Sequence, residues 1–179
     1  MLVRNSMEID GPVEQVYALA RDIYACADAM PDVKSVKVVE RSPDGSRVIA
    51  EWEVMAREFR ALIRWTTEDI WDDTAYTCKS SILKSDYYTY SGQCTLTDLG
   101  GRTRFESEVE IECDLPRVGS HVKNYIARKL EANVDSMLAV IKAKIEVSDA
   151  ANSGLLPEAI GEASEGSTES GGLGLSQGL

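Results

Sequence analysis

The chain has 179 residues, of which 44% are hydrophobic and 27% charged, a balance that supports one folded domain and argues against global disorder. Its formal net charge of -11 disfavours nucleic acids and anionic lipid surfaces as partners, because both are themselves negatively charged. No apolar stretch approaches the roughly 20 residues of a membrane-spanning helix, and residues 1–10 lack the apolar run of a secretory signal. We therefore expect a cytoplasmic protein without integral membrane association.

The first part of the chain is predicted to form a strand and two short helices. Residues 1–10 read as the strand, and Gly11 and Pro12 then open a helix, since proline suits a first helical turn. The apolar residues of this helix recur at helical spacing: Val13, Val16, Tyr17 and Ala20. A second helix is predicted over residues 24–29, where Pro31 prevents its continuation.

The hydrophobic period then changes to two, and six strands are predicted between residues 34 and 113. Turn sequences interrupt this region at residues 42–45, 72–73 and 100–101. The last strand alternates most cleanly, with arginine and glutamate residues on one face. Its other face carries Phe105, Ser107, Val109, Ile111 and Cys113. Such a pattern indicates an antiparallel sheet with one covered and one solvated side.

A long amphipathic helix is predicted from Pro116 to about Glu146. Its apolar stripe contains Val118, Val122, Ile126, Leu130, Val134, Met137, Leu138, Ile141 and Ile145. A helix of about 30 residues is roughly 45 Å long, and its one apolar face must lie against the sheet. The predicted domain therefore spans residues 1–146.

The composition changes after this helix, since residues 149–179 contain no lysine, arginine or aromatic residue. The same stretch holds seven of the 13 glycines and five acidic residues. It can bury too little apolar surface to offset the entropy of ordering. Residues 147–179 are therefore predicted to form a disordered acidic tail rich in glycine and serine. A plain solvated tail and a docking segment for a protein partner, based on the weak apolar cluster at residues 155–160, are the alternatives.

This order of elements resembles the START-like (SRPBCC) superfamily of helix-grip proteins, which includes polyketide cyclase/dehydrases and lipid-transfer domains. The resemblance covers residues 1–146. It includes MEIDGPVEQVYAL at residues 7–19, YSGQCTL at 90–96, GGRTRFESEVEIE at 100–112 and EANVDSMLAVIKAKIE at 131–146. It implies an α+β fold in which a curved seven-stranded antiparallel sheet wraps around the long C-terminal helix. The superfamily leaves a cavity between the sheet and that helix, so a small hydrophobic ligand is expected there.

The inward positions of the predicted sheet and helix combine large aromatic residues with small ones, which suits an apolar site with a few polar groups. The residues expected to contact the ligand are Trp52, Val54, Phe59, Ile63, Trp65, Thr67, Tyr76, Cys78, Tyr88, Tyr90, Phe105, Ser107, Val109, Tyr125, Asn133 and Met137. The alternative is that these side chains fill a core and bond to the backbone.

The resemblance extends to bacterial aromatic polyketide aromatase/cyclases, which carry a Trp-x-Ser-x-Arg stretch whose arginine is considered to anchor or polarise the polyketide. The matching residues 65–69 read WTTED, so Asp69 stands in place of that cation. With the charge reversed, an oxyanion could not be stabilised in the same way. Asp69 shares strand parity with Trp65 and could act as a base if desolvation raised its pKa. Solvation at a strand end is the simpler interpretation.

No cofactor or metal is expected. The four cysteines form no CxxC pair and the chain has one histidine, so a zinc site is not predicted, and the cysteines are expected to be buried as small hydrophobes. No GxSxG elbow, Walker loop or dinucleotide fingerprint occurs. Catalytic residues stay unassigned, and three functions stay open: a polyketide cyclase/dehydrase-like protein, a non-enzymatic carrier or chaperone for a lipid or quinone, and an interaction module with a vestigial cavity.

Overall fold

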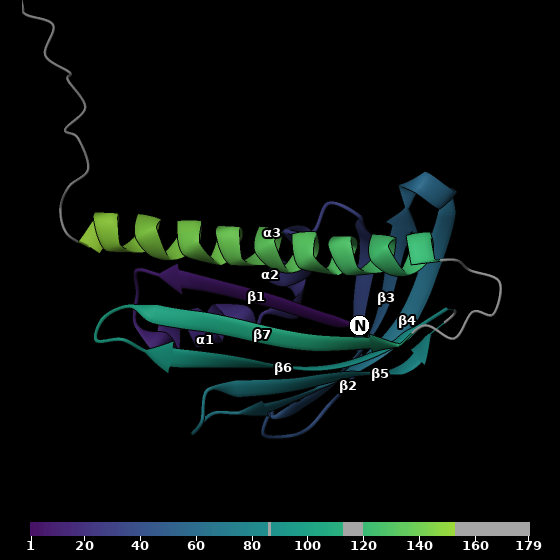
Figure 1. The fold of residues 1–179 in the computed structure, drawn as a ribbon. Helices are drawn as coiled ribbons and strands as arrows, with labels where there is room; N and C mark the ends of the chain where they lie inside the picture. Colours follow the sequence, from purple (N-terminus) through teal and green to yellow (C-terminus); the bar gives the residue numbers. More distant parts are fainter. Residues whose placement is uncertain (86, 113–119, 153–179) are drawn as a thin grey trace, which may run out of the picture.

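The computed structural model describes residues 1–85, 87–112 and 120–152 and, for residues 120–123 and 148–152, the backbone alone. Seven strands form one antiparallel sheet, and a long helix lies across one side of it (Figure 1). The predicted α+β helix-grip architecture is therefore confirmed. Cys113, Pro116 and the part of the predicted tail at residues 153–179 lie outside the described residues.

The N-terminal elements are β1 (Leu2–Ile9), α1 (Val13–Ala20) and α2 (Ile23–Asp28). Pro12 precedes α1 with an extended backbone, at φ -61° and ψ 144°, where a proline removes no helical hydrogen bond. The Asp22 carboxylate caps α2 by accepting a hydrogen bond from the Ala25 N–H at 3.1 Å. This cap starts α2 one residue before the predicted position.

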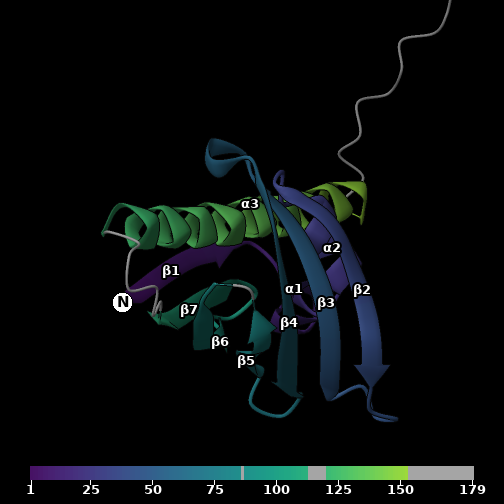
Figure 2. The same cartoon turned by 90° about the vertical axis from the view of Figure 1, so that its right-hand side faces the viewer.

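The other six strands are β2 (Val33–Arg41), β3 (Arg47–Ala56), β4 (Ala61–Asp72), β5 (Thr77–Ser85), β6 (Thr89–Asp98) and β7 (Thr103–Glu112). Their spatial order, β1-β7-β6-β5-β4-β3-β2, makes each strand antiparallel to its neighbours. The sheet is strongly curved, so that β1 and β7 run alongside the long helix while β2, β3 and β4 cross it (Figure 2). The curvature encloses a space between the sheet and that helix.

Alternation along β7 places one row of side chains inward and the glutamate row outward, as predicted. Phe105 is buried in the core, whereas the glutamates of this strand are exposed. On the neighbouring strand β6, Gly92 lies opposite Val109. A Cβ atom at Gly92 would lie 2.7 Å from the Glu108 carbonyl oxygen and 2.8 Å from Val109 Cγ2. The close approach of these two strands therefore requires a glycine at this position.

The long helix α3 (Ser120–Asn152) has 33 residues, lies along β1 and also contacts α1. The described part of its apolar stripe includes four buried residues: Ile126, Leu138, Ile141 and Ile145. Asn5 of β1 donates from Nδ2 to Asp135 Oδ1 at 2.8 Å, which ties the strand to the helix. α3 continues past the predicted end at Glu146, since no glycine or proline follows until Gly154. Within the described residues no helix is both long and apolar enough to cross a membrane.

The strand β2 forms the edge of the sheet opposite β1. Val36 and Val38 pack inward against the core, while the other side of the strand is exposed. Lys34, Lys37, Glu40 and Arg41 of this strand are all exposed. Two register irregularities interrupt its pairing with β3, at residues 33–35 and 38–40.

Buried apolar side chains form three clusters. The largest lies beneath α1 and the C-terminal half of α3, around Val16 and Leu138. A second gathers under the N-terminal half of α3, around Ile126. The third joins α2 to β3, around Ile23 and Ala50. These three clusters leave a space between the sheet and α3, and the candidate site lies in that space.

Candidate functional site

Two adjoining cavities lie between the sheet and α3. The first chamber has a volume of about 210 Å³ and the second chamber about 140 Å³. The side chains that line both chambers, and so form the partition between them, are Met30, Trp52, Tyr90, Leu130 and Val134. Ligand sites typically occupy roughly 300–1,000 Å³, so each chamber alone is small and the two together reach the lower end of that range.

The partition is held by a hydrogen bond between β3 and β4. Trp52 donates from Nε1 to Thr67 Oγ1 at 3.0 Å, and Thr67 is only 2% exposed. The Trp52 ring also stacks on that of Trp65, with the ring centroids 6.4 Å apart. Because the indole N–H and the threonine hydroxyl satisfy each other, this part of the wall behaves as an apolar surface.

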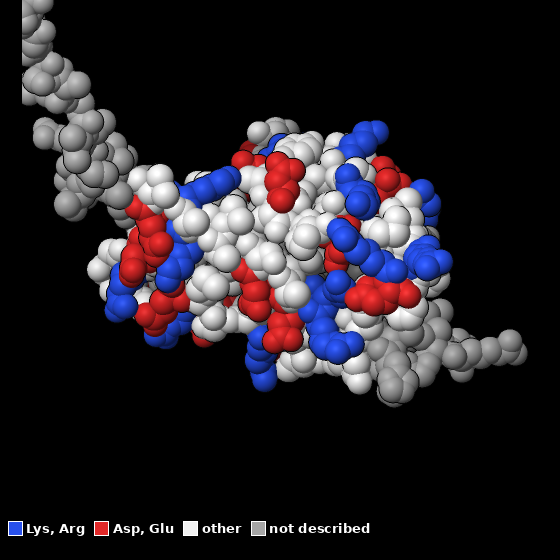
Figure 3. Space-filling view, turned by 90° about the horizontal axis from the view of Figure 1, so that it is seen from above, with Lys and Arg blue, Asp and Glu red and all other residues white. Residues whose placement is uncertain are grey.

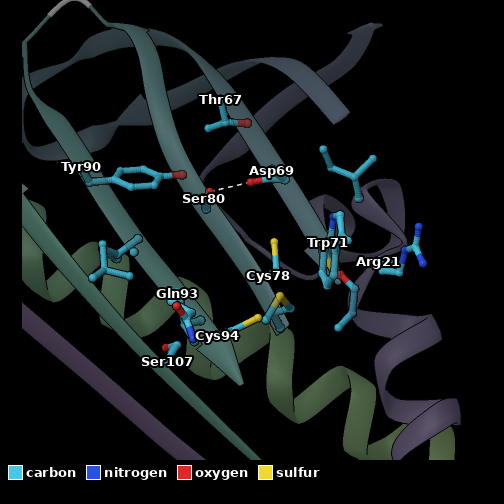
Figure 4. A pocket seen from close by; sticks show the side chains of 18 of the residues that line it. Arg21, Thr67, Asp69, Trp71, Cys78, Ser80, Tyr90, Gln93, Cys94 and Ser107 are labelled. Carbon is cyan, nitrogen blue, oxygen red and sulfur yellow. Dashed lines mark hydrogen bonds between the residues drawn. The ribbon is translucent and has the colours of Figure 1, made fainter. Parts of the chain in front are cut away.

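The wall of the first chamber also contains a carboxylate, Asp69. It lies on the inward face of β4, with Thr67 before it and Trp71 after it. Ser80, directly opposite on β5, donates from Oγ to Asp69 Oδ1 at 2.5 Å (Figure 4). Burial raises the pKa of the Asp69 carboxyl, and the bond from Ser80 acts in the opposite direction. Since β4 continues to Asp72, Asp69 does not occupy the solvated strand end that the sequence left as an alternative.

Tyr90 on β6 belongs to the same polar region. Its side chain points toward Ser80 and Asp69 (Figure 4). Burial, with the nearby charge of Asp69 as a smaller cause, raises the pKa of the Tyr90 phenol. The hydroxyl therefore stays protonated at neutral pH and remains able to donate a hydrogen bond.

Another polar group of the first chamber, the Ser107 hydroxyl, has no hydrogen-bond partner among the described residues. Ser107 Oγ on β7 is buried, and among the described residues it makes no hydrogen bond. It lies opposite Cys94 of β6. A buried hydroxyl left unpaired costs about 1–3 kcal/mol, so this group favours a guest or water that can bond to it.

Three cysteines also line the first chamber: Cys26, Cys78 and Cys94. Cys26 and Cys78 are buried, as expected, and all three are free thiols. Cys78 and Cys94 face each other across β5 and β6. Burial raises the pKa of Cys26 to about 12, and the bond with Cys94 together with burial raises the pKa of Cys78. In the described part of the chain, no three His, Cys, Asp or Glu side chains gather as metal ligands.

The second chamber lies nearer the N-terminal end of α3. Its wall includes Val54, Ile63, Trp65, Tyr88, Tyr125 and Asn133. Burial raises the pKa of the Tyr88 phenol. Asn133 supplies an amide from the helix side, at a half-buried position. A guest in this chamber would meet aromatic surface on the sheet side and the polar side chains of Lys129 and Asn133 on the helix side.

A cluster of charged side chains stands beside the second chamber. Lys129 of α3 donates to Asp32 Oδ2 at 2.7 Å, and its Nζ lies 3.7 Å from Glu58 Oε1. Arg57 Nε lies 3.1 Å from Asp32 Oδ1, and the Tyr125 hydroxyl donates to Glu58 Oε2 at 2.6 Å. Asp32 and Lys129 both line the chamber. These contacts join the α2–β2 connection, the β3–β4 turn and α3 at one place.

Charges of both signs also mix on the face of the molecule that carries α3. Figure 3 shows basic and acidic side chains interspersed there, with uncharged surface between them. The ion pair between Lys142 and Glu146, at 3.7 Å, is one example. The net charge of the chain is therefore not gathered into one acidic patch on this face.

Fourteen of the sixteen predicted ligand contacts line one or both chambers. Those at the first chamber alone are Thr67, Cys78, Phe105, Ser107, Val109 and Met137. Those at the second alone are Val54, Ile63, Trp65, Tyr88, Tyr125 and Asn133, and Trp52 and Tyr90 line both. The alternation of the strands and the stripe of the helix bring these side chains together. Their contact with a ligand stays a prediction.

Phe59 and Tyr76 line neither chamber, and Phe59 does not take its predicted inward position. Phe59 belongs to the short 3-10 turn η1 (Arg57–Phe59) and is half exposed. Its ring meets that of Tyr125 edge-on, with the ring centroids 4.9 Å apart. Tyr76 precedes β5 and has a positive φ of 50°. Its ring packs edge-on against that of Tyr17 of α1, with the ring centroids 5.2 Å apart. In both cases the predicted strand started too early, within the turn that precedes the observed strand.

The sequence prediction missed several residues that line the chambers. Val48 shares strand parity with Trp52, and Trp71 shares it with Trp65, so both could have been found from the alternation. Ile23, Cys26 and Met30 come from α2 and the residues after it. A six-residue helix is too short for a periodic signal that tells which side faces the cavity.

A family model described as "Polyketide cyclase / dehydrase and lipid transport" matches residues 2–146. None of the curated proteins matches the chain closely enough to indicate a relative. Among solved structures, TTHA0849 from Thermus thermophilus is 26% identical, with a TM-score of 0.71, and the match covers 83% of this chain and 99% of that one.

Two further solved structures share the fold at lower identity. The ZhuI aromatase/cyclase from Streptomyces sp. R1128 is 17% identical, with a TM-score of 0.67 over 85% of this chain and 97% of that one. Norcoclaurine synthase from Thalictrum flavum, solved with dopamine and hydroxybenzaldehyde, is 12% identical, with a TM-score of 0.64 over 82% and 87%. At these identities the likeness shows the fold alone.

Proposed function

We propose that this chain, which belongs to the polyketide cyclase/dehydrase and lipid-transport family, binds one small hydrophobic molecule of polyketide, aromatic or lipid type in the two chambers. One observation carries the proposal: three packed clusters leave an apolar space between the sheet and α3. That space contains a buried hydroxyl without a partner, Ser107 Oγ, within the described part of the chain. An apolar space with a few polar groups is typical of a ligand site.

The volumes favour a guest of modest size. The two chambers adjoin at Trp52 and Tyr90, so a flat bicyclic or tricyclic body could extend from one into the other if these side chains moved slightly. A long lipid chain would need a larger rearrangement. A compact aromatic or polyketide-like guest therefore fits better than an extended lipid.

The proposal can be tested with N-phenyl-1-naphthylamine, a neutral probe whose emission rises in apolar surroundings. The three tryptophans of the chain, Trp52, Trp65 and Trp71, all line the chambers, so energy transfer from them reports a probe bound inside. Saturable binding of one probe per chain is expected. Absence of saturable binding by folded protein would contradict the proposal.

A filling variant tests where the probe binds. Val134 of α3 lines both chambers and is partly buried, so Val134→Phe should weaken binding about tenfold or more, because the larger ring occupies the junction. Val147→Phe is the matched control, since Val147 lies on the same helix and is 70% exposed. Equal affinities of the two variants would place the probe elsewhere.

A second candidate function is acid–base catalysis on the bound molecule, of the cyclase or dehydrase kind. One observation favours it, namely the carboxyl of Asp69 facing the first chamber. The measurement is product formation from a cyclisable polyketide by wild type and by Asp69→Asn. A carrier would bind the compound and return it unchanged in both cases.

A further inference from the structure

The polar wall of the first chamber is an assembled group of side chains. Asp69 and Ser80 occupy paired positions on β4 and β5, and Tyr90 approaches from β6 (Figure 4). Ser80 lies opposite Gly92 on β6, so no β6 side chain covers the Asp69–Ser80 pair from that position. Three strands thus present a carboxylate and two hydroxyls to one region of a mostly apolar cavity.

The Asp69 carboxylate has unused capacity to accept hydrogen bonds. Two carboxylate oxygens offer about four acceptor sites. Among the described residues, the hydroxyl of Ser80 is the side-chain group that donates to it, at 2.5 Å. The remaining lone pairs would stay unsatisfied in an empty apolar cavity, which is unfavourable for a buried polar group.

Arg21, a cation in the wall of the first chamber, is engaged with other partners. Arg21 lines the first chamber, but its guanidinium pairs with Asp73 and donates to the Gly45 carbonyl oxygen at 2.8 Å. It also lies over the rings of Tyr17 and Trp71. Arg21 therefore does not neutralise Asp69, and a cationic or hydrogen-bond-donating guest could do so.

We infer that Asp69, Ser80 and Tyr90 form a subsite that takes the hydrogen-bond donor of the guest, a hydroxyl or a protonated amine, and disfavours a carboxylate. The inference rests on the proposed function, because it names which class of hydrophobic molecule the chambers select. Charge-assisted hydrogen bonds are about twice as strong as neutral ones, so the carboxylate provides most of the selectivity. The apolar body of the guest would extend past the partition toward the second chamber.

The test is a series of naphthalene compounds that share one body and differ in one group. They are 2-naphthol, 2-methoxynaphthalene, 2-naphthylmethylamine and 2-naphthoic acid, titrated at neutral pH with tryptophan emission as the readout. We expect 2-naphthol and the amine to bind about tenfold more tightly than the methoxy compound. The acid should bind more weakly than all three, since its charge repels that of Asp69.

Two variants connect this order to Asp69. Asp69→Asn should abolish the advantage of the amine and improve binding of the acid, and Asp69→Leu should also remove the advantage of 2-naphthol. Affinity for 2-methoxynaphthalene should stay unchanged in both variants, which shows that the chamber is intact. Glu110→Gln is the matched control, because Glu110 is an exposed residue on the outer face of β7 and its loss changes the net charge equally.

The possible failures are distinguishable. If all four compounds bind with equal affinity, or if Asp69→Asn behaves like Glu110→Gln, the donor subsite is refuted while the proposed function stands. If no compound of the series and no N-phenyl-1-naphthylamine binds to folded protein, the proposed function itself fails.

Discussion

The buried carboxylate of Asp32 is predicted to stabilise the contact between the α2–β2 connection and α3 beside the second chamber, and Asp32→Ala tests this. The Asp32 side chain is 9% exposed and pairs with Lys129 and Arg57, which are 35% and 64% exposed. Its backbone carbonyl also accepts from the Met55 N–H at 2.9 Å, a bond that the substitution leaves in place. Asp32→Ala therefore removes the side-chain ion pairs of Asp32 and keeps its backbone hydrogen bond to Met55.

The exposure of Asp32 and its two partners decides how much the free energy of unfolding falls. Hydrogen bonds to charged groups contribute about 1.5–3 kcal/mol each when buried. Here both cations can return to water after the substitution, and Glu58 remains near Lys129, so the full penalty of an unpaired buried charge does not apply. After discounting for solvent screening, we expect the free energy of unfolding to fall by about 2 kcal/mol.

Urea denaturation at neutral pH, followed by circular dichroism, measures the change. A double-mutant cycle with Lys129→Met should give a coupling energy of about 1 kcal/mol. The surface pair of Arg4 and Glu108, with side chains 69% and 56% exposed, is the control, and Glu108→Ala should cost less than about 0.5 kcal/mol. Additive effects of the Asp32 and Lys129 changes, or a loss no larger than that of the control, would refute the reasoning.

Three other predictions follow from single sites. Burial raises the pKa of the Asp69 carboxyl in the folded state, so at a pH above the ordinary pKa of an aspartate its negative charge opposes folding. Asp69→Asn should therefore raise the Tm at about pH 7 and leave it unchanged at about pH 3. A lower Tm at neutral pH would contradict this. Gly92→Ala should lower the free energy of unfolding by about 1–3 kcal/mol, because its Cβ would press on the backbone of β7. Ser91→Ala, on the exposed side of β6, is the control and should change the free energy of unfolding by less than about 0.5 kcal/mol in the same urea titration. Burial raises the pKa of Cys26 to about 12, so iodoacetamide at about pH 8 should alkylate Cys26 far more slowly in native protein than in urea, as read by mass spectrometry; equal rates would show that the thiol is accessible.

Much of the fold could be predicted because its signals are local and repeated. The period-two alternation of β7 fixes which side of that strand is covered, and the stripe along α3 fixes which side of the helix meets the sheet. The same parity along β4 indicates that Trp65, Thr67 and Asp69 share one face, and the structure places all three at the chambers. A periodic pattern predicts direction well because every residue in it reports the same geometry.

The turns were harder to predict. Arg60 ends the turn η1 in the left-handed region at φ 51°, where glycine or asparagine would be the usual signal. The strand pattern therefore appeared to run through Phe59. The turn at Tyr76 could not be predicted for the same reason, since a tyrosine at positive φ is uncommon.

The link at Asp32 could not be predicted either. Its partner Lys129 lies 97 positions further along the chain, and no local pattern connects an acidic residue after a short helix with one lysine among several on a long helix. The pairing results from how the sheet curves beneath α3, so it becomes visible only in three dimensions.

The free edge of the sheet has a consequence for the protein in concentrated solution. An edge strand exposes unpaired backbone N–H and C=O groups, which could template intermolecular sheets and aggregation. On β2 the lysines, Glu40 and Arg41 surround that backbone with charge, and the two breaks in register prevent a long, flat ladder. A second copy therefore finds no regular partner there, and a crowded sample should remain dispersed even though an entire side of one strand is left uncovered.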